Sequence, residues 1–159
     1  MKSKSKSLRR LIVACAAVCA LFVLFISIQS WGTLDIVFND IPADMADVQW
    51  LRITLVVGRY VLALAMVATL LVFLFRIWRG AGAGKLFIRG NQRWLYAMTI
   101  IYFFYSLVDG NAGNIVYNGI RQIEIYINEY MLISCFVLIV FAKLYAVAVE
   151  VSEEQELTI

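Results

Sequence analysis

The chain has 159 residues, a net charge of +3 and a hydrophobic fraction of 63%. Soluble domains are only about 45–50% apolar, so a soluble fold of this length would leave a large apolar surface in water. The chain has no histidine, the commonest general base and imidazole metal ligand, and no serine, threonine or acid falls in a nucleophile or metal-binding pattern. We therefore expect a membrane protein without catalytic, cofactor-binding or metal-binding residues, and not an enzyme.

The first predicted element is a membrane-spanning helix at residues 11–31. Its uncharged apolar run begins at Leu11 and is close to the ~20 helical residues that cross a bilayer core about 30 Å thick. The basic segment before it is also typical of a signal peptide, but the run exceeds the ~7–15 residues of a signal-peptide core and no A-x-A site follows. We expect this helix to stay attached as a membrane anchor.

Three further helices are predicted at residues 53–75, 94–109 and 130–149. The second and the fourth are long enough to cross a bilayer, although they contain Arg59 and Lys143. The third is the weakest prediction, because its uncharged run of about 15 residues gives a helix of only about 22 Å. A crossing at the third helix therefore depends on the charges that flank it.

The charges are divided between alternate loops. The segment before the first helix and the loop 76–93 hold ten of the fourteen basic residues and no acid, whereas the other two loops are mostly acidic. Since basic loops stay in the cytoplasm, the pattern predicts an all-α polytopic membrane protein. It would be a four-transmembrane-helix bundle with both termini cytoplasmic, in a single domain that ends in the cytoplasmic tail 150–159. If the third helix did not cross, the tail would lie outside.

Charged residues inside the predicted spans are the first candidate for a site. A charge at the centre of a membrane helix costs about 2.5–3.5 kcal/mol on insertion scales, so it is a functional hypothesis by default. Two interpretations stay open. Arg59 and Lys143 can extend to the headgroups as isolated charges. Alternatively, Arg59 pairs with Asp109 or Glu129 in a polar site on the outer side, and Lys143 faces an acid such as Glu150.

Smaller features flank the helices. Asn91 is placed to cap the third helix, and Arg93 and Trp94 are typical of an anchor at the membrane interface. The apolar residues 86–88, in a basic setting, are predicted to enter the headgroup layer of anionic lipids. On the outer side, the helical spacing of apolar residues at 120–130 predicts an amphipathic lead into the last helix.

Two short stretches carry a resemblance to a known family. The middle loop reads G-K-L-F-I-R-G-N-Q-R-W-L, with Gly84, Phe87, Asn91 and Leu95, and the chain ends in E-E-Q-E-L-T-I from Glu153 onward. With the four-span layout, these stretches resemble bacterial membrane proteins of domain-of-unknown-function family 2975. The resemblance implies a four-helix protein of the bacterial cytoplasmic (inner) membrane that works with a small helix-turn-helix transcription factor.

The function expected on this basis is that of a non-enzymatic membrane regulator or sensor. It would contact the lipid bilayer and a cytoplasmic protein partner, with no direct contact to nucleic acid, and self-association into a homo-oligomer stays open. The alternative is a small transporter, channel subunit or immunity protein that uses Arg59 and Lys143. The residues that the resemblance assigns to partner binding are Gly84, Phe87, Asn91, Glu153, Glu154, Glu156, Leu157 and Thr158.

Overall fold

The structure is a computed structural model of the whole chain. It describes residues 2–39, 46, 48–82, 87–117 and 129–157. Its four long helices are α1 (Lys2–Asn39), α2 (Gln49–Gly82), α3 (Gln92–Tyr117) and α4 (Glu129–Leu157). The all-helical class predicted from the sequence is confirmed for this part of the chain. Gly84, Thr158 and most of the amphipathic lead predicted at 120–130 lie outside the described residues.

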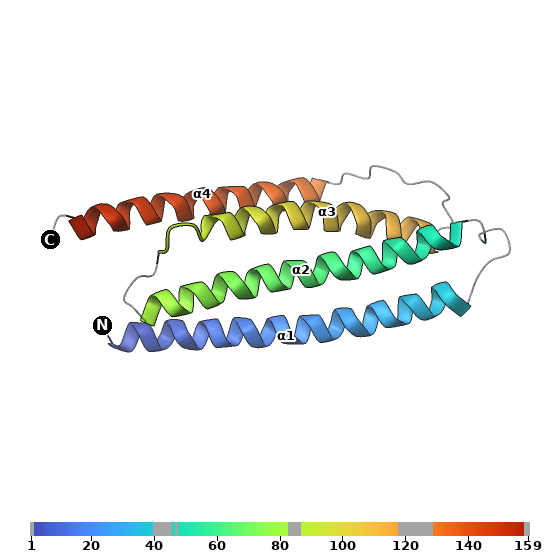
Figure 1. Cartoon of the computed structure of the whole chain (residues 1–159), viewed down its shortest axis with the longest axis horizontal. Helices are drawn as coiled ribbons and strands as arrows, with labels where there is room; N and C mark the ends of the chain where they lie inside the picture. The colour runs from blue at the N-terminus through green and yellow to red at the C-terminus, as the bar shows by residue number, and fades with distance from the viewer. Residues whose placement is uncertain (1, 40–45, 47, 83–86, 118–128, 158–159) are drawn as a thin grey trace.

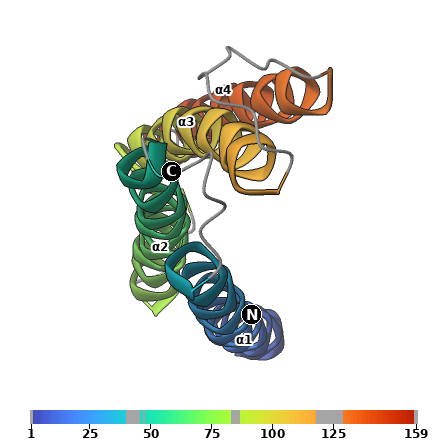
Figure 2. The same cartoon turned by 90° about the vertical axis from the view of Figure 1, so that its right-hand side faces the viewer.

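The helices lie side by side along one axis, each antiparallel to the next (Figure 1). The start of α1, residues 87–91 before α3 (which we call the turn) and the end of α4 share one end of the molecule, which we call the terminal end. Seen along the helices, the four form an open arc with α1 and α4 at its edges (Figure 2), and each packs against its neighbour in the chain. The expected four-helix bundle is therefore an open row of helices.

Each helix is longer than the apolar run from which it was predicted. The largest correction is at α1, which has 38 residues where the sequence predicts a helix at 11–31. α3 has 26 residues and is therefore about 39 Å long. The predicted tail 150–159 continues α4 as helix to Leu157. An apolar run marks only the part that matches a bilayer core. The backbone hydrogen bonds of the helices continue into the polar flanks. No proline interrupts them there, since the single proline, Pro42, lies between α1 and α2 in the sequence.

Three helices, α1, α2 and α4, are long and apolar enough to cross a membrane. Only 17% of the most apolar stretch of each is buried, and most apolar side chains of α1 and α4 are exposed. Exposing apolar area to water costs about 25 cal/mol per Å², and surroundings of lipid tails remove that cost. On α4 the exposed large apolar residues are Tyr130, Leu132, Ile133, Phe136, Val137, Ile139, Val140, Phe141, Leu144, Val147 and Val151.

The best-packed contact lies between α2 and α3, in the half opposite the terminal end. Leu55 of α2 packs with Ala112 and Ile115 of α3, and Ile115 is fully buried. Gly58 of α2 faces Val108 of α3: a Cβ built on the glycine would lie 3.8 Å from Cγ1 of Val108, an ordinary van der Waals distance. These contacts fix the register of α2 against α3, and with it the position of the polar residues that the two helices share.

Candidate functional site

A cluster of contacts at the terminal end surrounds Tyr145 of α4. Its hydroxyl accepts hydrogen bonds from the backbone N–H of Ile88 at 3.1 Å and from Nδ2 of Asn91 at 3.2 Å. The rings of Phe73 in α2 and Phe87 in the turn each lie edge-on to the tyrosine ring, with centroids 5.7 Å apart. Tyr145 therefore joins the turn to both α2 and α4.

Asn91 is the fully buried polar residue of this cluster. It directly precedes α3, as expected of a cap, and its backbone carbonyl accepts a hydrogen bond from the N–H of Trp94. Its described side-chain hydrogen bonds, however, run to Tyr145 and to Nε of Arg76, which donates to Oδ1 at 2.5 Å. The position predicted for Asn91 is correct, but the side chain connects α2 to α4 instead of capping α3.

The turn that carries Asn91 depends on Gly90. Its φ of 89° lies in the left-handed region, which costs glycine little and side-chain-bearing residues more. The N–H of Asn91 donates to the carbonyl of Ile88 at 3.1 Å, and the N–H of Arg93 donates to the carbonyl of Gly90 at 3.2 Å. Because of this turn, Ile88 and Asn91 reach the same tyrosine hydroxyl.

An ion pair links the turn to the end of α4. Nε of Arg89 lies 4.0 Å from a carboxylate oxygen of Glu153, so two stretches that are distant in sequence meet at the terminal end. Of the other residues assigned to partner binding, Glu154 is exposed on the last turns of α4. Glu156 and Leu157 have helical backbone there, and nothing is described of their side chains.

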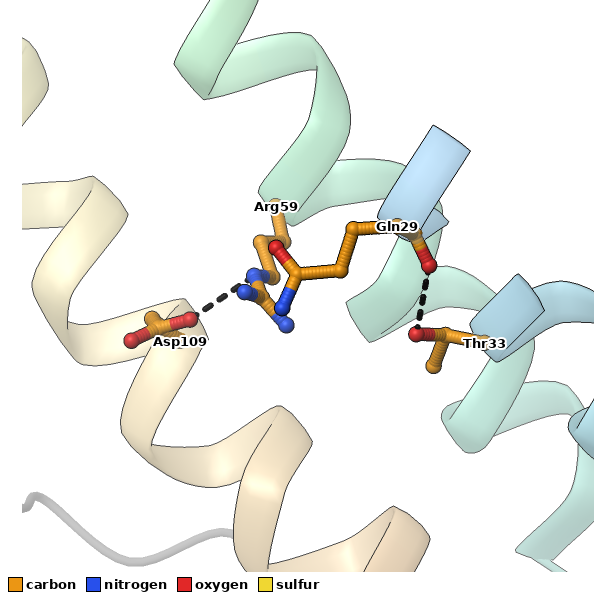
Figure 3. A network of polar contacts seen from close by, with 4 residues as sticks. All are labelled: Gln29, Thr33, Arg59 and Asp109. Atoms are coloured by element: carbon orange, nitrogen blue, oxygen red, sulfur yellow. Dashed lines mark hydrogen bonds and ion pairs between the residues drawn. The ribbon is translucent and has the colours of Figure 1, made fainter. Parts of the chain in front are cut away.

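A second polar contact lies in the opposite half of the molecule. Nε of Arg59 lies 2.7 Å from Oδ1 of Asp109, and the two side chains are 23% and 43% exposed. Of the two partners that the sequence leaves open for Arg59, the structure brings Asp109 to it. Figure 3 shows Arg59 reaching from α2 to α3, with the side-chain amide of Gln29 in α1 directed toward the guanidinium.

Lys143 does not belong to this polar contact. It is exposed on α4, two residues from Tyr145 and therefore in the terminal half, whereas Arg59 and Asp109 lie in the opposite half. No ion pair between Lys143 and an acid, Glu150 included, occurs within the described residues. Arg59 and Asp109 thus form one contact, and Lys143 stands apart from it.

Arg52 is a buried residue, although in the sequence it belongs to the mostly acidic predicted loop before the second helix. It is 2% exposed, and its guanidinium donates to Oε1 of Gln49 at 3.2 Å and to the carbonyl of Val116 at 3.5 Å. Gln49 in turn donates to the carbonyl of Val37 at 2.5 Å. The two side chains thus bond carbonyls in the last turns of α1 and α3. Because the last four carbonyls of a helix have no partner within it, the ends of α1 and α3 need hydrogen-bond donors from elsewhere, which is the sequence-level reason to expect residues such as Arg52 and Gln49 there.

The chemistry that these contacts support is hydrogen bonding and ion pairing. Among the residues that the structure describes, no three histidine, cysteine or acidic side chains are grouped so as to hold a metal ion. Fold and site together define an all-α protein that has three helices long and apolar enough to cross a membrane and polar contacts in both halves. No family model, curated protein or solved structure matches the chain, so membership of family 2975 stays a prediction.

Proposed function

We propose that this chain is a non-enzymatic regulator or sensor of the bacterial cytoplasmic membrane that acts through a cytoplasmic protein partner. All four helices cross the bilayer, and the terminal end faces the cytoplasm. A crossing by α3 is supported by its length of 26 residues and by its place between α2 and α4. The orientation is supported by the basic residues around the turn from α2 to α3. The partner implied by the family resemblance is a helix-turn-helix transcription factor.

The observation that carries the proposal is the meeting of the turn and the end of α4. Tyr145 holds Ile88 and Asn91 through its hydroxyl, and Arg89 faces Glu153. The helix continues past the apolar stretch to residue 157, so it presents a rigid polar surface beyond the bilayer. A shift of α2 can be transmitted to that surface through Tyr145, because the ring of Tyr145 also contacts Phe73 of α2.

The transport alternative has less support. It needs Arg59 and Lys143 along one polar path, but Arg59 is paired with Asp109 in one half of the molecule and Lys143 is exposed in the other. An exposed lysine at the edge of the row is better suited to the lipid headgroups, which its long side chain can reach.

Crosslinking in intact membranes, followed by affinity purification of the tagged chain and mass spectrometry, tests the proposal. Deleting residues 153–159 should abolish capture of a helix-turn-helix protein, while the shortened chain stays in the carbonate-resistant membrane fraction. The matched control neutralises acids in the opposite half, with Asp35→Asn and Glu129→Gln, and should leave capture unchanged. If the deleted chain captures the same protein as well as the full chain does, the end of α4 is not the docking surface.

A further inference from the structure

A basic cavity lies at the terminal end, between the last turns of α2 and the first turns of α3. Its volume is about 700 Å³, and three arginines contribute to its wall. The lining contains no acid among the described residues. Its residues are Arg76, Arg89, Gly90, Gln92, Arg93, Trp94 and Ala97.

The lining favours an anion with several oxygen acceptors. A guanidinium carries five N–H donors in a planar fork that matches phosphate geometry. Arg76 uses its Nε on Asn91, which fixes the side chain and leaves its two terminal amino groups for a ligand. Arg89 lies 4.0 Å from Glu153, but its side chain is 81% exposed, and such a pair holds a guanidinium only weakly. The positive end of the α3 dipole adds to the same field.

The lining of the cavity changes from charged to apolar along α3. Arg93 is at the start of the helix, whereas Ala97 is one turn further toward the apolar part, and the indole of Trp94 lies between them in sequence. A soluble phosphate would need only the arginines. A molecule with a charged head and an apolar body fits both parts of the lining, and Trp is typical of the level in a bilayer where such molecules change from polar to apolar.

We propose that this cavity binds the phosphate headgroup of an anionic phospholipid from the cytoplasmic leaflet. Basic pockets between membrane helices on the cytoplasmic side are suited to such headgroups. The arginines contact the phosphate oxygens, and Trp94 and Ala97 contact the start of the acyl chains. The inference rests on the proposed placement of α2 and α3 in the membrane, but not on the proposed protein partner.

Native mass spectrometry of the full chain released from detergent micelles tests this. Protein is incubated with phosphatidylglycerol, with phosphatidylcholine or with inorganic phosphate. We expect phosphatidylglycerol adducts to survive at activation energies that remove phosphatidylcholine. The variant Arg89→Gln/Arg93→Gln should lower phosphatidylglycerol affinity about tenfold or more, since each arginine near a headgroup contributes about 1 kcal/mol.

The control Arg10→Gln/Arg79→Gln changes the net charge equally, at exposed arginines of α1 and α2 outside the cavity wall. It should bind phosphatidylglycerol like the original chain. A charge-neutral variant, Ala97→Leu, narrows the cavity and should weaken binding.

Three outcomes would contradict the proposal. Equal losses of phosphatidylglycerol affinity in the two arginine variants would show that binding depends on net surface charge and not on the cavity. Equal retention of phosphatidylglycerol and phosphatidylcholine would show that the cavity does not select an anionic headgroup. Displacement of phosphatidylglycerol by millimolar inorganic phosphate would assign the cavity to soluble phosphate. Reporter fusions at Ile159 measure the membrane placement separately, so failure of the site and failure of the proposed topology are distinguishable.

Discussion

At the scale of single residues, the hydroxyl of Tyr145 does the most to hold the terminal end together. Replacing it by phenylalanine keeps the rings of Phe73 and Phe87 in contact but removes the acceptor of two hydrogen bonds. Leaving the donors of Ile88 and Asn91 unpaired costs about 1–3 kcal/mol.

We therefore predict that Tyr145→Phe lowers the free energy of unfolding by about 1–2 kcal/mol, measured by denaturant titration in micelles. Amide hydrogen exchange at Ile88 should become faster. The control is Tyr130→Phe, because Tyr130 is 81% exposed at the start of α4. Unchanged exchange at Ile88 would show that the hydroxyl does not hold the turn.

The pair of Arg59 and Asp109 gives a second prediction at this scale. Removing either partner leaves the other charge without its ion pair, whereas removing both leaves no unpaired charge. In a double-mutant cycle of Arg59→Leu and Asp109→Leu, we expect a coupling of about 0.5–1.5 kcal/mol, the range of polar contacts between membrane helices. Lys143→Leu should change the free energy of unfolding little. A purely additive cycle would mean that the two side chains do not stabilise each other.

At the scale of elements, the connection between α2 and α3 depends on the backbone of Gly90. Ala at a position with φ of 89° is strained, so Gly90→Ala should lower the free energy of unfolding by about 1 kcal/mol. Gly113 is the matched control. It lies inside α3 with nothing within 4 Å of a built Cβ, so Gly113→Ala should be neutral or stabilise the helix by about 0.5–1 kcal/mol. Thermal unfolding in micelles measures both, and equal effects would contradict the role of the turn.

The sequence predicted the existence of all four helices better than their ends. Apolar runs marked where each helix lies, but the helical extent of α4 beyond residue 149 depends on polar residues with no apolar period. The third run is short because Asp109 and Asn111 end it. These residues and the tyrosines within the run lower the mean hydropathy of α3, which is not among the helices apolar enough to cross a membrane by composition. Hydropathy and helix length are separate properties, and an apolar run in the sequence reports only the hydropathy.

The candidate site was predicted only in part, for a different reason. The sequence places Arg59 inside the second apolar run and offers Asp109 and Glu129 as its two possible partners. In the sequence, Arg76 is only one basic residue of the loop 76–93, and Tyr145 has no assigned role. Their roles depend on contacts with Asn91 and Ile88 across 15 and 57 residues of sequence. A single sequence shows that a polar group is present but not which distant segment reaches it.

At the scale of the whole molecule, the open row of helices has little interior. The buried clusters lie between neighbouring helices, and large apolar side chains cover the outside of α1 and α4. A soluble protein hides such side chains because water makes their exposure costly. Lipid removes that driving force, and membrane helices associate instead through close packing and polar contacts. The contacts at Leu55, Arg59 and Tyr145 therefore matter more to this fold than they would to a soluble one.

The number of crossings is the property of the whole molecule on which the proposed function depends. If α3 crosses, the end of α4 shares the cytoplasm with the turn, and a green fluorescent protein fused after Ile159 should fluoresce in intact cells. Alkaline phosphatase fused after Tyr117 should be active, because that junction would lie outside. If α3 does not cross, the three apolar helices alone place the end of α4 outside, so the fusion at Ile159 would be dark and the phosphatase at Tyr117 inactive. The second pattern would also separate α4 from the basic turn across a bilayer, which is incompatible with Tyr145 bonding to Ile88. The two fusions therefore test the topology and the central contact of the fold together.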